Sequence, residues 1–194
     1  INGCYRPFRK YNKYTGEKLY GVEAGMVNPI NHPPEMTSIA TVAARRLGVT
    51  EGWFKIDFIH DPVFGWCVLE CTTRCSGGWD VSHVAPLVGN DATSILLDYS
   101  TGLPLDRTKI GRHNGLYGVT YIPMYREGKI DGWDGIDEAL RSGATYVFPR
   151  STSYIPKLVD SATRSIFIIA VGDSPCVAWT KAARASKLIK PRYV

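Results

Sequence analysis

The sequence lacks any run of about 18 apolar residues, the length that a membrane-spanning helix needs. Its longest apolar stretch, 166–171, has the length of a buried strand. Residues 1–4 lack the basic start and apolar core of a signal peptide. We therefore expect no membrane partner. Because the chain begins with Ile1 rather than Met, we also expect it to start partway through a longer product.

The five cysteines form no disulfide framework, because their number is odd and their spacing is irregular. Cys67, Cys71 and Cys75 are each separated by three residues. Familiar zinc and iron–sulfur motifs have at least one pair separated by two residues. We interpret these residues as buried apolar thiols in a reducing compartment, which predicts a cytoplasmic protein.

Long blocks of positive charge are also missing, although the net charge is +5. The exception is a row at intervals of three near the end of the chain: Lys181, Arg184, Lys187 and Lys190. We interpret this row as a solvated helix face rather than a nucleic-acid-binding stripe, so we expect no nucleic-acid partner. A modest positive excess suits an enzyme that handles phosphates.

The chain has 194 residues, 44% of them hydrophobic, which suffices for one large or two small globular domains. No internal repeat or low-complexity tract is present. A polar segment with Gly and Pro, 102–115, predicts two domains, 1–110 and 111–194. Strands arrive in hairpins rather than as strand–helix–strand units, which predicts an α+β fold with mainly antiparallel pairing.

Hydrophobic periodicity predicts the individual elements. Strands are expected over 4–8, 18–22, 24–26, 53–59, 66–71, 116–123, 145–148 and 165–171. Helices are expected over 33–47, from about 81, over 92–99 and over 136–141, and a last helix is expected after a cap at Ser174. Residues 126–129 are expected to form a turn.

Two acidic residues fall on neighbouring strands of a predicted hairpin. If 62–65 is a four-residue loop, Asp61 pairs with Trp66, and counting back places Ile59 opposite Val68. The same count places Asp57 opposite Glu70. Thr72 lies two residues beyond Glu70 and therefore on the same face.

Two carboxylates directly opposite one another repel and destabilise a hairpin. A shared proton, a cation from elsewhere or a bound metal would relieve the repulsion, and an oxygen cluster of this kind suits Mg²⁺. A register shifted by one residue would instead put the two acids on opposite faces. A solvent-facing pair spanned by Lys55 is a further alternative, and periodicity does not decide among these.

The segment 69–74, Leu-Glu-Cys-Thr-Thr-Arg, resembles the Glu-x-Asn-x-Arg motif of the ATP-grasp superfamily, which follows an acidic residue on the preceding strand. The resemblance implies that Asp57 and Glu70 hold Mg²⁺, with Mn²⁺ as an alternative, and that Arg74 binds the transferring phosphoryl group. Thr72 stands where the family has Asn and becomes the third metal-site residue. This departure also motivates a second reading, an inactive ATP-grasp-like module that binds only nucleotide or a partner.

The similarity extends beyond this motif. Segments 21–26 and 164–173 are similar to the glycine-rich strand and the closing segment of phosphoribosylamine–glycine ligase-like members, and the carbamoyl-phosphate-synthase-like members are also similar. The resemblance implies an ATP-grasp carboxyl-terminal subdomain, an antiparallel sheet with helices, followed by a small β-rich closing domain.

The implied activity is that of an ADP-forming ligase that joins a carboxylate to an amine through an acyl-phosphate. The expected partners are small-molecule substrates and an amino-terminal half of the same enzyme, and a homodimer is left open. We expect these 194 residues alone not to turn over ATP, because no glycine-rich lid is recognisable in them.

Candidate nucleotide contacts lie in two loops. Backbone N–H groups of Ser76, Gly77 and Gly78 would cradle a phosphate, or these residues form a plain turn before a helix. Lys10 and Lys13 would contact phosphates, or they face water as most lysines in polar turns do.

Overall fold

The computed structural model describes residues 3–8, 22–28, 34–76, 79–104, 106, 108, 114–160 and 162–194, with only the backbone described for 3–8 and 22–28. The chain divides into two compact units. The first unit comprises Ile1–Gly3 and Pro29–His113, and the second comprises Cys4–Asn28 and Asn114–Val194. Each unit is described by itself below. No helix of the described residues is both long enough and apolar enough to cross a membrane.

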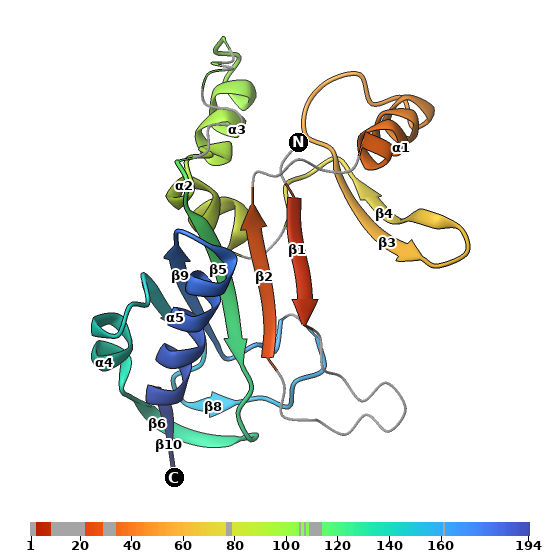
Figure 1. Cartoon of the computed structure of the whole chain (residues 1–194). Coiled ribbons are helices and arrows are strands. Elements are labelled where there is room, and N and C mark those ends of the chain that lie inside the picture. Colours follow the sequence, from red (N-terminus) through yellow and green to blue (C-terminus); the bar gives the residue numbers. More distant parts are fainter. Residues whose placement is uncertain are drawn as a thin grey trace. The chain divides into compact units, whose positions relative to one another are not determined.

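The first unit contains a helix, a hairpin and a helical segment (Figure 1). Its elements are α1 (Pro34–Arg46), β3 (Lys55–Asp61), β4 (Gly65–Thr72), the π-helical turn η1 (Asp80–Val84), α2 (Ala85–Leu87) and α3 (Ala92–Ser100). The predicted α1 is confirmed, and Arg45 and Arg46 in its last turn complement the negative end of the helix dipole. Asp91 caps α3, because its side chain accepts a hydrogen bond from the Ser94 backbone N–H.

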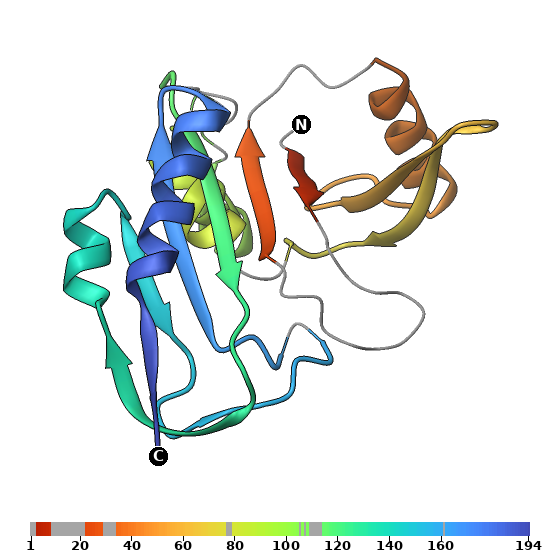
Figure 2. The ribbon, with the colours of Figure 1, turned by 60° about the horizontal axis from the view of Figure 1, so that its bottom comes forward.

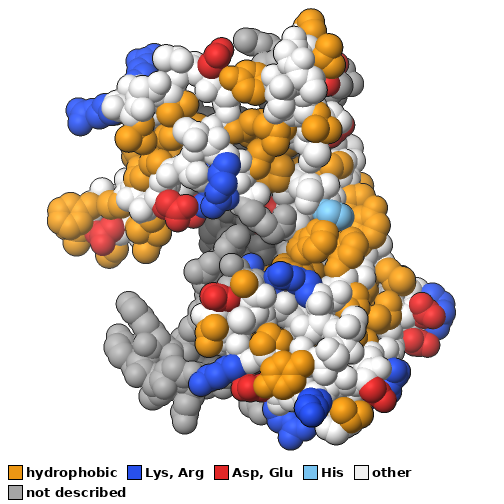
Figure 3. Space-filling model, turned by 180° about the vertical axis from the view of Figure 1, so that it is seen from behind, with side chains coloured by type: hydrophobic (Ala, Val, Ile, Leu, Met, Phe, Trp, Pro, Cys, Tyr) orange, Lys and Arg blue, Asp and Glu red, His pale blue; other side chains and the backbone are white. Residues whose placement is uncertain are grey.

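The buried side chains of the first unit lie along η1, α2 and α3. They include Val84, Ala85, Val88, Ala92 and Ile95. In contrast, α1, β3 and β4 contribute no buried side chain. Hydrophobic side chains therefore remain exposed on the hairpin, and hydrophobic groups are visible among the charged ones on the molecular surface (Figure 3).

The second unit is built on a five-stranded sheet in the order β1 (Gly3–Phe8), β2 (Val22–Asn28), β5 (Tyr117–Pro123), β9 (Ile166–Gly172) and β7 (Tyr146–Pro149). The pairs β2–β5, β5–β9 and β9–β7 are antiparallel. A smaller sheet has the order β10 (Lys190–Tyr193), β6 (Gly128–Asp134) and β8 (Tyr154–Ile155). Two helices complete the unit, α4 (Ile136–Arg141) and α5 (Pro175–Leu188).

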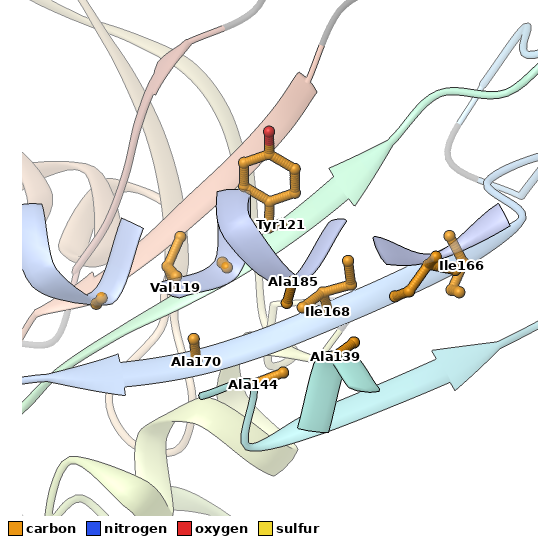
Figure 4. Close-up of a cluster of buried hydrophobic side chains, with 11 residues drawn as sticks. Val119, Tyr121, Ala139, Ala144, Ile166, Ile168, Ala170 and Ala185 are labelled. Atoms are coloured by element: carbon orange, nitrogen blue, oxygen red, sulfur yellow. The ribbon is translucent and has the colours of Figure 1, made fainter. Parts of the chain in front are cut away.

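Helix α5 lies across β9 and β5 (Figure 2). It buries Ala178, Ala182 and Ala185, whose spacing places them on one face and whose small side chains let the helix approach the sheet closely. Isoleucines of β9 and Val119 of β5 meet these alanines in the hydrophobic core (Figure 4). The apolar run 166–171 is therefore the central strand of a core, as its composition predicts.

The observed fold confirms the α+β class with antiparallel sheets. The sequence analysis did not predict the strands β6, β8 and β10. Strand β6 begins at Gly128, within the segment 126–129 that was predicted to be a turn. The sequence analysis assigned residues 4–28 to the domain 1–110, but they lie in the second unit, where β2 pairs with β5. Whether the two predicted domains fold separately stays a prediction.

The predicted basic row does not lie on one helix, because α5 ends at Leu188 and Lys190 begins β10. Two of its residues have structural contacts. Lys181 Nζ donates a hydrogen bond to the Val171 backbone oxygen at 3.0 Å, and the Arg184 guanidinium donates to the Ser142 backbone oxygen. These contacts fix the helix to the ends of β9 and α4. The absence of a nucleic-acid partner stays a prediction.

Candidate metal and phosphate site

The turn of the β3–β4 hairpin is fixed by Asp61. Its Oδ1 accepts hydrogen bonds from the backbone N–H groups of Val63, at 2.8 Å, and Phe64, at 2.9 Å. The two hydrogen bonds lower the pKa of the Asp61 carboxyl below its ordinary value of 3.8. Gly65 follows with φ of 73°, a conformation that glycine adopts without strain. The turn therefore consists of residues 62–64, and Asp61 pairs with Gly65 at the end of the ladder.

The pairing changes register within the hairpin. Near the turn, Phe58 lies opposite Val68, but the next residue, Asp57, lies opposite Glu70. Leu69 is thus an extra residue in β4, a β-bulge. The predicted pair Asp57–Glu70 is confirmed, whereas the predicted pairs of Asp61 with Trp66 and of Ile59 with Val68 are wrong.

One face of the hairpin carries the four residues at its open end. Lys55 lies opposite Thr72, and Asp57 lies opposite Glu70. Because partners in an antiparallel ladder point to the same side and alternate residues share a face, these four side chains lie together. The sheet thus brings together all three residues assigned to metal binding, Asp57, Glu70 and Thr72.

The ammonium group of Lys55 lies between the two carboxylates. Its Nζ is 2.6 Å from Asp57 Oδ2 and 3.7 Å from Glu70 Oε1. The Lys55 side chain is 21% exposed, whereas those of Asp57 and Glu70 are 48% and 57% exposed. The hairpin therefore has the arrangement that the sequence left open as an alternative, an acidic pair spanned by Lys55.

The chemistry of this face also fits Mg²⁺. The ion takes one or two carboxylates and completes its octahedron with water and phosphate oxygens. The half-exposed carboxylates leave outward-facing oxygens for that purpose, and the ammonium shows that the face accommodates positive charge. In the described part of the chain, no three His, Cys, Asp or Glu residues come together as a metal site. A metal here would therefore depend on the two acids together with Thr72.

Arg74 lies beyond the end of the strand. Because β4 ends at Thr72, the alternation of side chains along the strand does not place Arg74 beside Glu70. The side chain is exposed, and its Nη1 donates a hydrogen bond to the Cys75 backbone oxygen at 2.9 Å. Ser76 is half-buried in the following loop.

The other four candidate nucleotide contacts, Lys10, Lys13, Gly77 and Gly78, lie outside the described residues. Their assignment therefore stays a prediction.

The cysteines differ from the expectation of buried thiols. Cys67, Cys71 and Cys75 are half-buried free thiols, and Cys176 is exposed. Cys67 and Cys71 lie on a two-stranded ribbon that has no fully buried side chain, and neither is deeply buried.

His83 was not placed by sequence reasoning and lies on η1. Its Nδ1 is 2.7 Å from Ser82 Oγ, and its ring packs edge-on against Trp79 with the ring centroids 4.4 Å apart. A π-helical turn is rare and often marks a functional site, but it has no periodicity that a sequence would show.

Solved structures provide the comparison. The L-amino acid ligase from Bacillus licheniformis is 19% identical, with a TM-score of 0.70 over 98% of this chain and 49% of that protein. Phosphoribosylglycinamide synthetase from Anaerococcus prevotii is 13% identical, with a TM-score of 0.73 over 100% of this chain and 49% of that protein. The chain has the fold of the ATP-grasp ligases.

N5-carboxyaminoimidazole ribonucleotide synthetase from Thermotoga maritima shares the ATP-grasp fold at 18% identity, with a TM-score of 0.61 over 89% of this chain and 47% of that protein. The chain thus spans about half the length of these ATP-grasp structures. No family model and no curated protein matches the sequence.

Proposed function

We propose that this ATP-grasp chain carries the metal and phosphate site of an ADP-forming ligase. The ligase would join a carboxylate to an amine through an acyl-phosphate, using ATP and Mg²⁺. The observation that carries the proposal is the placement of Asp57 opposite Glu70 on one face of the hairpin, with Thr72 beside them. The similar structures, an amino acid ligase and a phosphoribosylglycinamide synthetase among them, support a ligase.

In this proposal, Asp57 and Glu70 hold the metal, and Thr72 ligates it or hydrogen-bonds one of its waters. When bound, Mg²⁺ supplies Lewis-acid and template chemistry at phosphate oxygens. The residues of the hairpin orient the donors. Asp61 closes the turn and the bulge at Leu69 sets the register, so the two carboxylates face the same side.

Arg74 would engage the phosphoryl group in transit. A guanidinium can grip phosphate through two parallel hydrogen bonds, which an ammonium cannot reproduce. Releasing Arg74 from the Cys75 carbonyl would cost about 1 kcal/mol, the net worth of an ordinary hydrogen bond. Phosphoryl transfer asks mainly for positioning and charge stabilisation, and an exposed arginine two residues past the acidic strand can supply both.

Nucleotide contacts are assigned to backbone groups of Ser76, Gly77 and Gly78 and to the side chains of Lys10 and Lys13. The proposal includes small-molecule substrates and a cytoplasmic location, and it includes no nucleic acid. The proposal assigns the adenine site and the substrate site to an amino-terminal half of the enzyme, and the chain's match to about half the length of the similar structures supports this assignment.

The test is an assay of the protein that carries these residues. We expect ADP release that depends on Mg²⁺ and on a carboxylate, with hydroxylamine trapping the acyl-phosphate as a hydroxamate. Glu70→Gln should abolish both signals. Glu138→Gln is the matched control, because Glu138 is an exposed glutamate that also pairs with a cation, Arg141.

Retention of full activity by Glu70→Gln would refute the assignment of the metal site. Binding of ATP without any ADP release, by a correctly folded protein across a panel of carboxylates, would instead support the inactive nucleotide-binding module.

A further inference from the structure

The position of Lys55 has a consequence for the metal site. Among the described residues, Lys55 is the cation that pairs with Asp57 and Glu70. Asp57 lies on the same strand as Lys55, β3, and Glu70 lies on the neighbouring strand, β4. Its Nζ is within 4 Å of an oxygen of each, at 2.6 Å and 3.7 Å. An ion shared by the two carboxylates would need the same region of space.

We infer that Lys55 is a built-in counter-ion that competes with Mg²⁺ for Asp57 and Glu70, so that the metal binds only by displacing its ammonium group. This inference rests on the proposed function, since it concerns the same metal site. It predicts that the chain binds the ion more weakly than its two carboxylates would allow.

The hairpin needs a counter-ion when no metal is present. Opposed carboxylates repel one another across a strand pair. A two-stranded ribbon is marginally stable by itself, and β3 and β4 bury no side chain that would offset the repulsion. Lys55 offsets the repulsion in the ion-free state and so keeps the two carboxylates in register.

The ammonium is also positioned to leave. Lys55 contacts the carboxylates through one short ion pair and one longer one, and both acids are about half exposed. Ion pairs in that environment are weak and screened by salt. A divalent ion binding both carboxylates can therefore replace the lysine without disrupting a buried network.

The test measures metal binding by the 194-residue chain, without substrates. Binding of Mn²⁺ is followed from its free-ion EPR signal at constant ionic strength, with Mg²⁺ as competitor. Lys55→Met, which keeps the length of the side chain but removes its charge, should bind Mn²⁺ about fivefold more tightly, the scale of one exposed ion pair. Lys55→Arg should bind like the wild type.

Lys187→Met is the matched control. It removes the same charge from an exposed position on α5, in the second unit, and should leave Mn²⁺ affinity unchanged. A second measurement uses thermal unfolding. Without metal, Lys55→Met should unfold at a lower temperature than the wild type, and saturating Mg²⁺ should raise its unfolding temperature by more than that of the wild type.

Two further variants separate this inference from the proposed function. If Asp57→Asn and Glu70→Gln abolish Mn²⁺ binding while Lys55→Met binds like the wild type or more weakly, the competition is refuted and the metal site stands. If Asp57→Asn and Glu70→Gln leave Mn²⁺ binding unchanged, the hairpin holds no metal, and both the inference and the metal site fall.

Discussion

Asp57 lies opposite Glu70 only because β4 contains one residue more than its partner strand between Glu70 and Val68. A regular ladder continued from the turn would pair Asp57 with Leu69 and Glu70 with Ile56. The two carboxylates would then project from opposite faces. The bulge at Leu69 is therefore the feature that assembles the candidate site.

Deleting Leu69 tests this register. Removal of the extra residue regularises the ladder and leaves Asp57 opposite Glu70, so Mn²⁺ affinity should stay within about threefold of the wild type, less than the effect of one good ion pair. Leu69→Ala, at a side chain that is 65% exposed, is the control for loss of the side chain alone. If the deletion instead creates metal binding that the wild type lacks, Glu70 pairs with Ile56 in the wild type.

Arg74→Lys tests the phosphoryl contact in the protein that carries this chain. We expect kcat to fall by about 10²-fold, the scale for losing one preorganised charge contact in the transition state. The nucleotide KM should change little, because the contact is proposed for the phosphoryl group in transit. Arg46→Lys, at an exposed position in the last turn of α1, is the control. A near-normal kcat would favour a structural role, such as the hydrogen bond to the Cys75 backbone oxygen.

The turn of the hairpin should be sensitive to acid through Asp61. Because hydrogen bonds lower the pKa of this carboxyl in the folded state, its contribution to stability is fully present above 3.8 and is lost as pH falls through the lower, folded value. In NMR titrations the amide shifts of Val63 and Phe64 should therefore change with a midpoint below 3.8. Asp61→Asn should abolish this transition. A midpoint at or above 3.8 in the wild type would contradict the hydrogen-bonded turn.

Gly135→Ala should destabilise the second unit. Gly135 precedes α4 with φ of 80°, and a Cβ there would overlap the backbone oxygen of Leu188. We expect a loss of about 1–2 kcal/mol for the left-handed backbone and a further ~1–3 kcal/mol for the overlap. Gly115→Ala, with φ of 83° and nothing within 4 Å of its Cβ, should show only the first loss. If urea unfolding shows that both variants lose the same free energy of unfolding, the overlap at Gly135 is relieved without a cost in stability.

Local signals predicted much of the fold. The start of α5 follows from Ser174, whose hydroxyl accepts a hydrogen bond from the Val177 N–H, and from Pro175 in the first turn. Strand β6 could not be predicted in this way, because Ile130 is its one buried residue and its conformation depends on pairing with β10, about sixty residues away. A polar segment that becomes a strand only by pairing with distant residues shows no hydrophobic periodicity in its own sequence.

The acidic pair was predicted correctly through two errors that cancel. The turn joins Asp61 to Gly65 rather than to Trp66, and the bulge at Leu69 restores the one-residue difference. An exposed leucine has no sequence signature of a bulge, so neither error was recognisable. The position of Arg74 could not be predicted in the same way, because β4 ends at Thr72 and the end of a strand is set by its partner rather than by its own residues.

The pairing of β2 with β5 has a consequence for the way the chain responds to a protease. A nick in the exposed segment between Ser100 and Pro104 would separate the polypeptide into an amino-terminal and a carboxyl-terminal piece. The amino-terminal piece would still carry β2, which is hydrogen-bonded to β5 of the carboxyl-terminal piece from Val22 to Val27. The two pieces would therefore migrate together in a native gel and come apart only in denaturant, as a split protein held together by a shared sheet.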